Sequence, residues 1–387
     1  MMPRTKHAPA QHVPRRQACA RVRARVVNHA HLVAGQAKHT KPPTAGFNVQ
    51  PAFIGQFAGV AKVSPLFVDV IHCVRDAIVL VVYPTYVASR DIRISEVLPM
   101  PDTRVQTLLD ELDVIVFPGV YDALSAKIAQ RAGFPLSFIS GYSVSASLIG
   151  EPDMGFLTQM EMIDRARQVC LNVNIPIIVD ADTGYGNPLN VIRTVNELIV
   201  AGAAGCFLED QVWPKKCGHM RGKRVIDREE YIDKIRAANE ARGGRDFFIV
   251  SRTDALAPAG MDEAVARMHE AREAGANASF IEAPGSKEQM RTICANAPKP
   301  NVANMIEGGK TPVLPKAELA DIGYQLILHP LAGLYAAAQA IEDVYSQLKA
   351  NQTTLGADTA LMQFEQFNGL IGVEDRYHLA ERFGVKS

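Results

Sequence analysis

The chain has 387 residues, of which 48% are hydrophobic and 21% charged, as in an ordinary globular protein with one large domain or two smaller ones. No apolar run is long enough to span a membrane, and the six cysteines lack the spacing of a zinc site or a compact disulfide framework, which favours a reducing compartment. The 41 basic and 41 acidic residues are unevenly placed: ten Lys/Arg precede the first acidic residue, Asp69, so the rest of the chain is net acidic, which argues against nucleic acid as a partner.

Residues 1–95 are basic and contain several prolines but little periodicity. Three interpretations stay open. A transit peptide is rich in Arg and poor in acids, as here, but is also Ser-rich and amphipathic, unlike this stretch. A nucleic-acid-binding arm fits the charge alone. In the third, translation starts near Met100. We expect a disordered or non-native extension over 1–95 and a folded domain over 96–387, located in the cytoplasm or, with a transit peptide, in an organelle.

Downstream, short β-branched runs alternate with helical patterns, typified by residues 188–203 and 261–276, each of which ends in Ala-Gly-Ala. Near-continuous apolar strands that alternate with helices indicate parallel β/α units. Eight such units predict a closed (β/α)₈ TIM-type barrel, whereas an open doubly wound sheet would favour a G-x-G-x-x-G turn, which is missing after the first strand. The expected strands are 114–119, 136–141, 177–182, 206–211, 247–255, 279–283, 301–305 and 325–330.

Polar residues follow these runs, where a barrel of this kind carries its catalytic groups. They are Ser140, Asp180, Asp182, Glu209, Asp210, Arg252, Asp254, Glu282, Asn304 and His329.

The run "VDADTGYGN" places Asp180 and Asp182 two residues apart on one expected strand, so both should face the same way. Two carboxylates that point the same way from one strand end repel each other unless a cation lies between them. Mg²⁺ prefers a few carboxylates and retained waters. Glu209 on the next strand could complete the ligand set. The alternative is a solvated acidic rim.

Arg252 ends a buried strand, and a buried Arg needs an anionic partner. That partner is either Asp254 or a neighbouring acid, or the carboxylate or developing oxyanion of a substrate. The Gly pair in "NMIEGGKTP" either exposes backbone N–H groups to an anion or forms an ordinary loop.

The segment "WPKKCGHMRGKR" places Cys217 among cations and between glycines. Nearby cations lower the pKa of a thiol, and the glycines suggest a mobile loop that closes over a site. The alternatives are an inert surface cysteine and a zinc ligand, which would need a partner pair that is absent here.

These motifs, together with "SGYSVSASLIGEPDMG", "LEDQVWPKKCGHMRGK" and "IEAP", resemble the isocitrate lyase/phosphoenolpyruvate mutase superfamily from about residue 100 to the C-terminus. They resemble most the branch of petal death protein, 2,3-dimethylmalate lyase and oxaloacetate hydrolase, and also carboxyvinyl-carboxyphosphonate phosphorylmutase. The resemblance implies a (β/α)₈ barrel, Mg²⁺ or alternatively Mn²⁺, a small dicarboxylate substrate, no nucleic acid or membrane partner, and a homotetramer with exchanged C-terminal helices. Residues 335–351 and 360–371 would supply those helices.

The resemblance also implies roles for particular residues. The metal ligands would be Asp153, Asp180, Asp182 and Glu209. The substrate-binding residues would be Ser140, Gly141, Tyr142, Gly218, Arg252, Glu282 and Asn304. The catalytic groups would be Lys215, Cys217, His219 and Arg252, with Cys217 as the general acid on a gating loop.

The implied function is Mg²⁺-dependent C–C cleavage of a 2-hydroxy or hydrated 2-oxo dicarboxylate, such as 2,3-dimethylmalate, another 2-alkylmalate or oxaloacetate. The alternatives are a phosphonate-forming phosphomutase, a 2-methylisocitrate lyase, and a non-catalytic barrel for assembly or signalling. Methylisocitrate lyases carry an arginine for the third carboxylate, where "PLAGLY" here has Tyr335. A phenol cannot pair with a carboxylate as a guanidinium does, so we expect a diacid.

Overall fold

The computed structural model describes residues 73–74, 77–78, 103–356 and 358–385. The chain divides into two units, Met1–Ile92 and Arg93–Ser387. In the first unit, β1 (Cys73–Val74) pairs with β2 (Ala77–Ile78) in antiparallel register. The predicted extension over 1–95 and its three interpretations otherwise lie outside the described residues.

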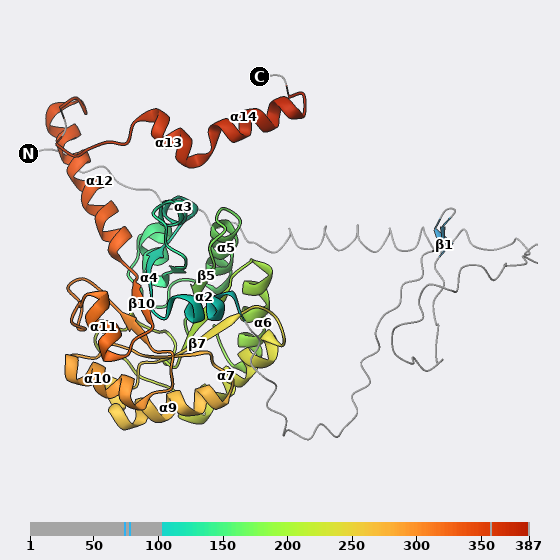
Figure 1. Cartoon of the computed structure of the whole chain (residues 1–387), viewed down its shortest axis with the longest axis vertical. Helices are drawn as coiled ribbons and strands as arrows, with labels where there is room; N and C mark the ends of the chain where they lie inside the picture. The colour runs from blue at the N-terminus through green and yellow to red at the C-terminus, as the bar shows by residue number, and fades with distance from the viewer. Residues whose placement is uncertain (1–72, 75–76, 79–102, 357, 386–387) are drawn as a thin grey trace, which may run out of the picture. The chain divides into compact units, whose positions relative to one another are not determined.

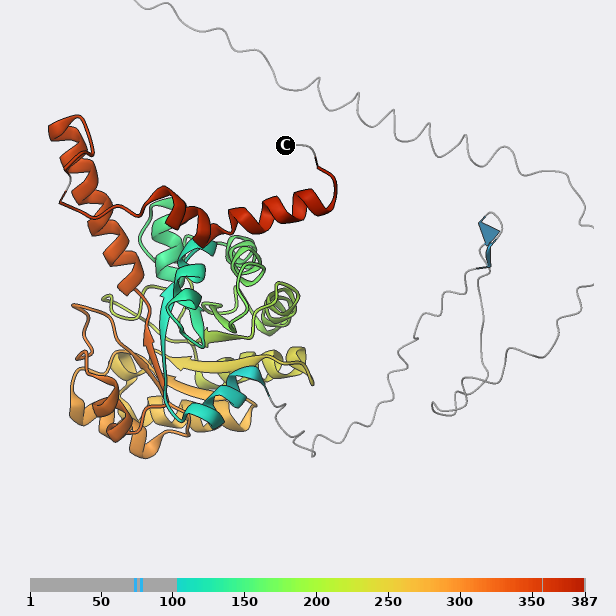
Figure 2. The ribbon, with the colours of Figure 1, turned by 45° about the horizontal axis from the view of Figure 1, so that its top comes forward.

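The second unit contains a parallel barrel of eight strands, as predicted (Figures 1 and 2). Neighbours pair in the order β8-β7-β6-β5-β4-β3-β10-β9, and a parallel bridge between Ser279 and Asn301 joins the two ends. Each strand falls within or beside a predicted run. Their bounds are β3 Ile115–Val120, β4 Ser137–Ile139, β5 Ile177–Asp180, β6 Gly205–Glu209, β7 Phe248–Thr253, β8 Ala278–Ile281, β9 Val302–Asn304 and β10 Leu326–His329.

Helices surround the barrel, and local sequence explains where several of them begin and end. Asn187 caps the helix that starts at Pro188, and Gly202, in the left-handed region at φ 93°, follows its end. Asp122 and Thr158 begin two further helices with capping boxes. The bounds are α2 Arg104–Leu112, α3 Ala123–Arg131, α4 Gly141–Val144 with a π-helical turn Ser145–Ile149, α5 Gln159–Cys170, α6 Pro188–Val200, α7 Arg228–Arg242, α8 Leu256–Ala259, α9 Met261–Glu273, α10 Lys287–Asn296 and α11 Lys316–Ile322.

Aromatic side chains fill the barrel interior below the strand ends. The rings of Phe138 and Phe207 lie 4.6 Å apart between centroids, and Phe207 meets Phe280 at 5.5 Å. All three are almost fully buried. Because rings in contact at such distances pack densely, this layer gives the polar groups above it a rigid, dry floor.

Three helices follow the last strand: α12 (Ala332–Asn351), α13 (Phe364–Ile371) and α14 (Val373–Arg382). None of their described residues is buried. Even apolar side chains are exposed to solvent, such as Tyr345 at 67% and Phe364 at 80%. In both views α12 extends away from the barrel (Figures 1 and 2). Among the described residues, no helix is both long and apolar enough to cross a membrane.

Candidate active site

A narrow cavity of about 30 Å³ lies at the carboxyl ends of the barrel strands. Ordinary ligand clefts have roughly 300–1,000 Å³, so the cavity as described is narrow. Of the predicted site residues, Lys215, His219, Gly141, Asp182 and Glu209 contact the lining groups from behind. The lining itself contains Ser140, Tyr142, Asp153, Asp180, Cys217, Gly218, Arg252, Glu282 and Asn304, with Phe138, Phe207, Phe280, Ile306, Leu328, Pro330 and Leu331.

Asp180 is the last residue of β5, and Asp182 lies in the tight turn that follows. The prediction that both lie on the strand is wrong, because β5 ends at Asp180 and Asp182 adopts a positive φ of 49°. The Asp182 N–H turns back to Oδ1 of Asp180 at 3.2 Å, while Gly141 N–H donates to Oδ2 at 3.2 Å. A side chain on Gly141 would lie 2.9 Å from that oxygen, so the glycine lets the backbone approach the carboxylate.

The ammonium of Lys215 lies among the acids. Its Nζ is 2.5 Å from Asp153 Oδ1 and 2.7 Å from Asp182 Oδ1, and all three side chains are at most 8% exposed. Burial raises the pKa of Asp182 to about 7 against the opposing charge of Lys215. The acids predicted to hold a metal thus already surround one positive charge, supplied by the loop.

The negative charge of Glu209 is less well balanced by cations than that of Asp153 and Asp182. Burial holds its pKa well above the ordinary value, against the charge of Arg252. Arg252 Nη2 lies 3.1 Å from Oε2, whereas the buried Oε1 has no hydrogen-bond or ion-pair partner among the described residues. An orphaned, buried carboxylate oxygen beside other acids is a donor suited to a hard cation.

Charge also favours a further cation at the cavity. The lining residues and the groups in contact with them include more buried carboxyl groups than buried cations, namely Asp153, Asp180, Asp182, Glu209, Asp254 and Glu282 against Lys215, Lys223 and Arg252. The donor chemistry therefore fits Mg²⁺. Within the described residues, however, no three His, Cys, Asp or Glu side chains are arranged around one point as metal ligands, because Lys215 stands between two of the acids.

Arg252, at the end of β7, forms ion pairs with three carboxylates. Its Nε donates to Asp254 Oδ2 at 3.0 Å, and its Nη2 faces Glu209 Oε2 at 3.1 Å and Glu282 Oε2 at 3.4 Å. Although burial lowers it, the pKa of Arg252 is held well above its ordinary value by these carboxylates. The alternative left open by the sequence, an ion pair with Asp254, is thus present, and it engages only one edge of the guanidinium.

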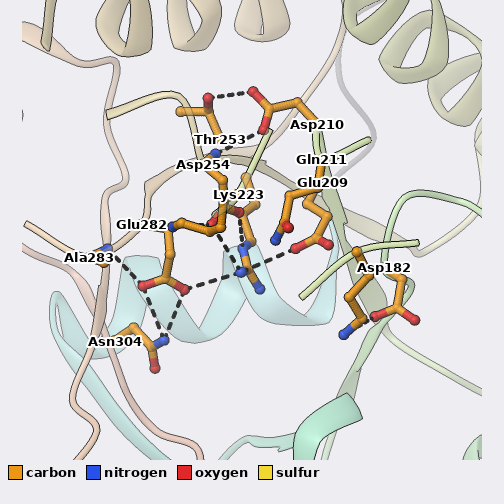
Figure 3. Close-up of polar contacts among 12 residues, drawn as sticks. Asp182, Glu209, Asp210, Gln211, Lys223, Thr253, Asp254, Glu282, Ala283 and Asn304 are labelled. Atoms are coloured by element: carbon orange, nitrogen blue, oxygen red, sulfur yellow. Dashed lines mark hydrogen bonds and ion pairs between the residues drawn. The ribbon is translucent and has the colours of Figure 1, made fainter. Parts of the chain in front are cut away.

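Glu282 joins three parts of the site. It accepts hydrogen bonds from Asn304 Nδ2 at 3.1 Å and from the Ala283 N–H at 2.7 Å (Figure 3). His219 Nε2 lies 3.2 Å from its Oε1. Burial works against ionisation, yet Arg252 and His219 lower the pKa of Glu282 to about 2.

His219 links the loop to the turn after β9. Its Nδ1 accepts the Lys310 N–H at 2.9 Å, which assigns the ring proton to Nε2, facing Glu282. The Gly-Gly turn proposed as an anion site thus offers this N–H to the imidazole. A side chain on Gly309 would lie 2.5 Å from Nδ1, so the turn must be glycine there.

The loop that carries Lys215, Cys217 and His219 is pinned at its base. Gln211 forms an antiparallel bridge with Val225, and its side-chain amide holds both backbone groups of Lys216, at 2.7 and 3.1 Å. At the tip, the Cys217 N–H donates to Asp153 O at 3.0 Å. A side chain on Gly218 would lie 2.4 Å from Glu282 Cγ, so the tip is in direct contact with the site.

The predicted lowering of the Cys217 pKa is wrong. Burial raises the pKa of this thiol to about 11, and the nearby carboxyls of Asp153 and Glu282 add to the effect while Arg252 opposes it. The cations adjacent in sequence do not surround the sulfur, because Lys215 points into the acid cluster and Arg221 is exposed. The thiol is therefore protonated at neutral pH.

Several participating residues were not foreseen from the sequence. Lys223 Nζ lies 2.6 Å from Asp254 Oδ1, and the buried Asp210 accepts hydrogen bonds from the Thr253 hydroxyl and the Asp254 N–H (Figure 3). Arg267 from α9 also pairs with Asp210, at 3.0 Å. Asp210 and Asp254 were noted as strand-end acids, and the Arg252–Asp254 pair was one open alternative, but Lys223 and Arg267 lie many residues away along the chain, where no local spacing reveals them.

The remaining predicted residues lie at the cavity mouth. Ser140 lines the cavity while its hydroxyl accepts the Ser143 N–H as the cap of α4, and Tyr142 lines it from the same short helix. Burial and the neighbouring Tyr142 raise the pKa of Tyr335 to about 12. Tyr335 thus lies next to Tyr142, which lines the cavity.

The arrangement can be compared with known proteins. A family model for phosphoenolpyruvate phosphomutase matches residues 105–349. The chain belongs to this family. It is an enzyme of the isocitrate lyase/phosphoenolpyruvate mutase superfamily, as its motifs suggested.

Its relatives include both mutases and lyases. The chain is 50% identical to chloroplastic carboxyvinyl-carboxyphosphonate phosphorylmutase of Arabidopsis thaliana, over 73% of this chain and 86% of that one. It is 46% identical to petal death protein of Dianthus caryophyllus (73% and 89%) and 44% identical to 2,3-dimethylmalate lyase of Eubacterium barkeri (70% and 94%).

Solved structures share the fold. Oxaloacetate acetylhydrolase in complex with 3,3-difluorooxalacetate superposes with a TM-score of 0.69 at 35% identity, covering 73% of this chain and 97% of that one. Phosphonopyruvate hydrolase in complex with oxalate and Mg²⁺ gives a TM-score of 0.65 at 29% identity, covering 73% and 99%. Superfamily members thus bind a divalent metal and small diacids at this fold.

Proposed function

We propose that this enzyme is a Mg²⁺-dependent lyase that cleaves the C2–C3 bond of a 2-hydroxy or hydrated 2-oxo dicarboxylate, such as 2,3-dimethylmalate, another 2-alkylmalate or oxaloacetate. The observation that carries the proposal is the convergence, at one narrow cavity, of an acid cluster, Arg252 and a protonated Cys217 thiol. Relatives named as 2,3-dimethylmalate lyase and oxaloacetate acetylhydrolase support the substrate class.

Asp153, Asp180, Asp182 and Glu209 would hold the metal. When bound, Mg²⁺ supplies Lewis-acid stabilisation of negative charge on the 2-oxygen and the adjoining carboxylate. The donor set of buried carboxylates and the unpartnered oxygen of Glu209 support this assignment, and Mn²⁺ has the same ligand preference.

The chain's own residues have separate tasks. Arg252 orients a substrate carboxylate, since its Nη1 makes no contact with a carboxylate among the described residues. Transfer of the 2-hydroxyl proton to a carboxylate of the acid cluster then forms a carbonyl at C2 as the C2–C3 bond breaks, and the electron pair passes to C3 as an enolate-like carboxylate. Cys217 gives its S–H proton to C3 and becomes a thiolate, which a later proton neutralises. The closed loop keeps water from the enolate.

Tyr335 favours a diacid over a tricarboxylate. It lies near Tyr142 at the cavity mouth and offers a neutral phenol, whose raised pKa prevents ionisation at neutral pH. A third substrate carboxylate would find no guanidinium at this position. We therefore rank 2-methylisocitrate below the 2-alkylmalates and oxaloacetate.

A phosphonate-forming phosphomutase is the second candidate. The 50% identity to carboxyvinyl-carboxyphosphonate phosphorylmutase favours it, because that figure exceeds the identity to either of the two other relatives compared. The same metal cluster and Arg252 would serve that reaction, whereas a proton donor on the loop is required specifically by C–C cleavage.

The deciding experiment is a substrate panel with the purified full-length chain and Mg²⁺. It contains 2,3-dimethylmalate, oxaloacetate, 2-methylisocitrate and phosphonopyruvate, each with and without excess chelator. We expect turnover of a diacid, abolished by chelator and restored by Mg²⁺ or Mn²⁺. Full turnover in chelator would refute the metal assignment, and turnover of phosphonopyruvate alone would favour the phosphomutase.

We also propose a homotetramer with exchanged C-terminal helices, because α12, α13 and α14 have no buried residue among those described and expose apolar side chains such as Tyr345 and Phe364. For the compartment, the chloroplastic relative supports an organelle, with the cytoplasm as the alternative.

A further inference from the structure

One buried ion pair at the site is not accounted for by the proposed chemistry. Lys223 Nζ lies 2.6 Å from Asp254 Oδ1, and the two side chains are 3% and 0% exposed. Lys223 touches neither the cavity nor the acid cluster around Lys215. A buried ammonium with a single carboxylate partner is costly to desolvate, so its presence beside the site calls for a reason.

Asp254 is shared between two cations (Figure 3). Its Oδ1 faces Lys223, while its Oδ2 accepts the Nε–H of Arg252 at 3.0 Å. The second donor on that edge of the guanidinium, Nη2, is already 3.5 Å from Oδ1. Arginine and a carboxylate favour two parallel hydrogen bonds. Here the second of them is long, because Lys223 holds the shared Oδ1 at 2.6 Å while Nη2 donates to it at 3.5 Å.

Because Asp254 is shared between Lys223 and Arg252, the Arg252 guanidinium can also contact other carboxylates. Its Nη2 also faces Glu209 Oε2 at 3.1 Å and Glu282 Oε2 at 3.4 Å. If Asp254 Oδ1 were free to bind Nη2 at a normal hydrogen-bond distance, the guanidinium would turn toward Asp254 and away from these two carboxylates. Glu209 and Glu282 would then face an incoming dianion with less compensating charge.

Asp254 itself is rigid. Its N–H donates to Asp210 Oδ1 at 2.8 Å, and Asp210 is fixed by Thr253 and Arg267. Lys223 is rigid as well, because it precedes Arg224, whose carbonyl accepts the Val212 N–H at the pinned base of the loop. The loop tip can therefore move without displacing Lys223.

We propose that Lys223 is a positioning residue for dicarboxylate binding. By occupying one oxygen of Asp254, it keeps the Arg252 guanidinium directed at Glu209, Glu282 and the substrate. This inference rests on the proposed function only in taking a dicarboxylate as the ligand.

The test measures oxalate binding, with Mg²⁺ present, by isothermal titration calorimetry on the full-length chain. Lys223→Met keeps the length of the side chain and removes its charge, and Lys223→Arg restores the charge. Lys216→Met is the matched control, because Lys216 lies on the same loop but its side chain makes no ion pair among the described residues. We expect Lys223→Met to weaken oxalate binding about tenfold, the equivalent of ~1.4 kcal/mol, and Lys223→Arg and Lys216→Met to stay within threefold of the wild type.

The outcomes are distinguishable. If the wild type fails to bind oxalate, the dicarboxylate assignment fails. If it binds and Lys223→Met binds equally well, the positioning role fails alone. Should Lys223→Met not fold, Lys223→Leu, which also removes the donor to Asp254, replaces it with the same expectation. Where a diacid substrate is turned over, Lys223→Met should raise KM much more than it lowers kcat, whereas general damage to the fold would lower the active fraction and leave KM unchanged.

Discussion

At the scale of single residues, burial rather than sequence neighbours sets the chemistry. Cys217 lies among cations in the sequence, and a lowered pKa was the reasonable expectation. In the structure Lys215 is drawn to Asp153 and Asp182, and the thiol is left beside carboxyls with its pKa raised to about 11. A thiol that keeps its proton is better suited to donate it than to attack as a nucleophile.

Cys217→Ser tests the proton donor. Serine keeps the size but is a much weaker acid, so we expect C–C cleavage to fall at least about 10²-fold while oxalate binding changes little. Steady-state kinetics and calorimetry measure the two effects. Cys170→Ser, a half-buried cysteine on α5 outside the site, is the control. Cleavage at the wild-type rate in Cys217→Ser would show that the proton comes from elsewhere.

The carboxyl of Glu282 should make stability depend on pH. Its folded-state pKa of about 2 lies below the ordinary 4.5, so its contribution to stability is full above pH 4.5 and is lost as pH falls toward 2. Glu282→Gln should therefore lower the free energy of unfolding by up to roughly 3 kcal/mol at pH 7, and by progressively less below pH 4.5. Urea unfolding followed by circular dichroism at pH 7, 5 and 3.5 measures this. A difference that is independent of pH would contradict the ion-pair explanation.

At the scale of elements, the strands were predictable and the loop was not. Each of the eight strands is an apolar run flanked by helical periodicity, a signal contained within about ten residues. The prediction placed Asp182 on the strand β5, but this residue lies in the following turn. A pattern of alternating side chains does not indicate that a non-glycine residue adopts a φ of 49°. The pairing of Lys223 with Asp254 crosses from the loop to the end of β7 and has no local signal at all.

Gly218 tests whether the loop must reach this depth. An alanine Cβ would lie 2.4 Å from Glu282 Cγ and 2.7 Å from Arg252 Nη2, so Gly218→Ala should prevent full closure. We expect kcat/KM to fall by about 10²-fold, the size of effect that misplaced catalytic groups cause, with the melting temperature nearly unchanged. Gly244→Ala, where a Cβ meets nothing within 4 Å, is the control. Normal turnover in Gly218→Ala would mean that the closed arrangement is not the reacting one.

At the scale of the whole molecule, the barrel buries its own core while the C-terminal helices do not. The proposed exchange between subunits would cover Phe364 and its apolar neighbours. In that exchange, the residues that cover them would come from another copy of the chain.

Phe364→Asp should therefore weaken assembly without unfolding the barrel. Its side chain is 80% exposed within one chain, so the substitution removes little packing there. Sedimentation velocity at micromolar concentration should show tetramers for the wild type and for Glu365→Ala, and smaller species for Phe364→Asp. A wild type that sediments as a monomer would end the exchange proposal.

A tryptophan at the base of the loop can report movement of the loop through its fluorescence. Trp213, the chain's one tryptophan, is 43% exposed and lies 6.0 Å, between ring centroids, from Tyr185, in the turn that follows Asp182. Because indole emission responds to nearby water and charge, opening of the lid should alter the colour or intensity of the protein's own fluorescence. Stopped-flow mixing with a diacid, followed by tryptophan fluorescence, could thus measure the rate of loop opening and closing without an added dye.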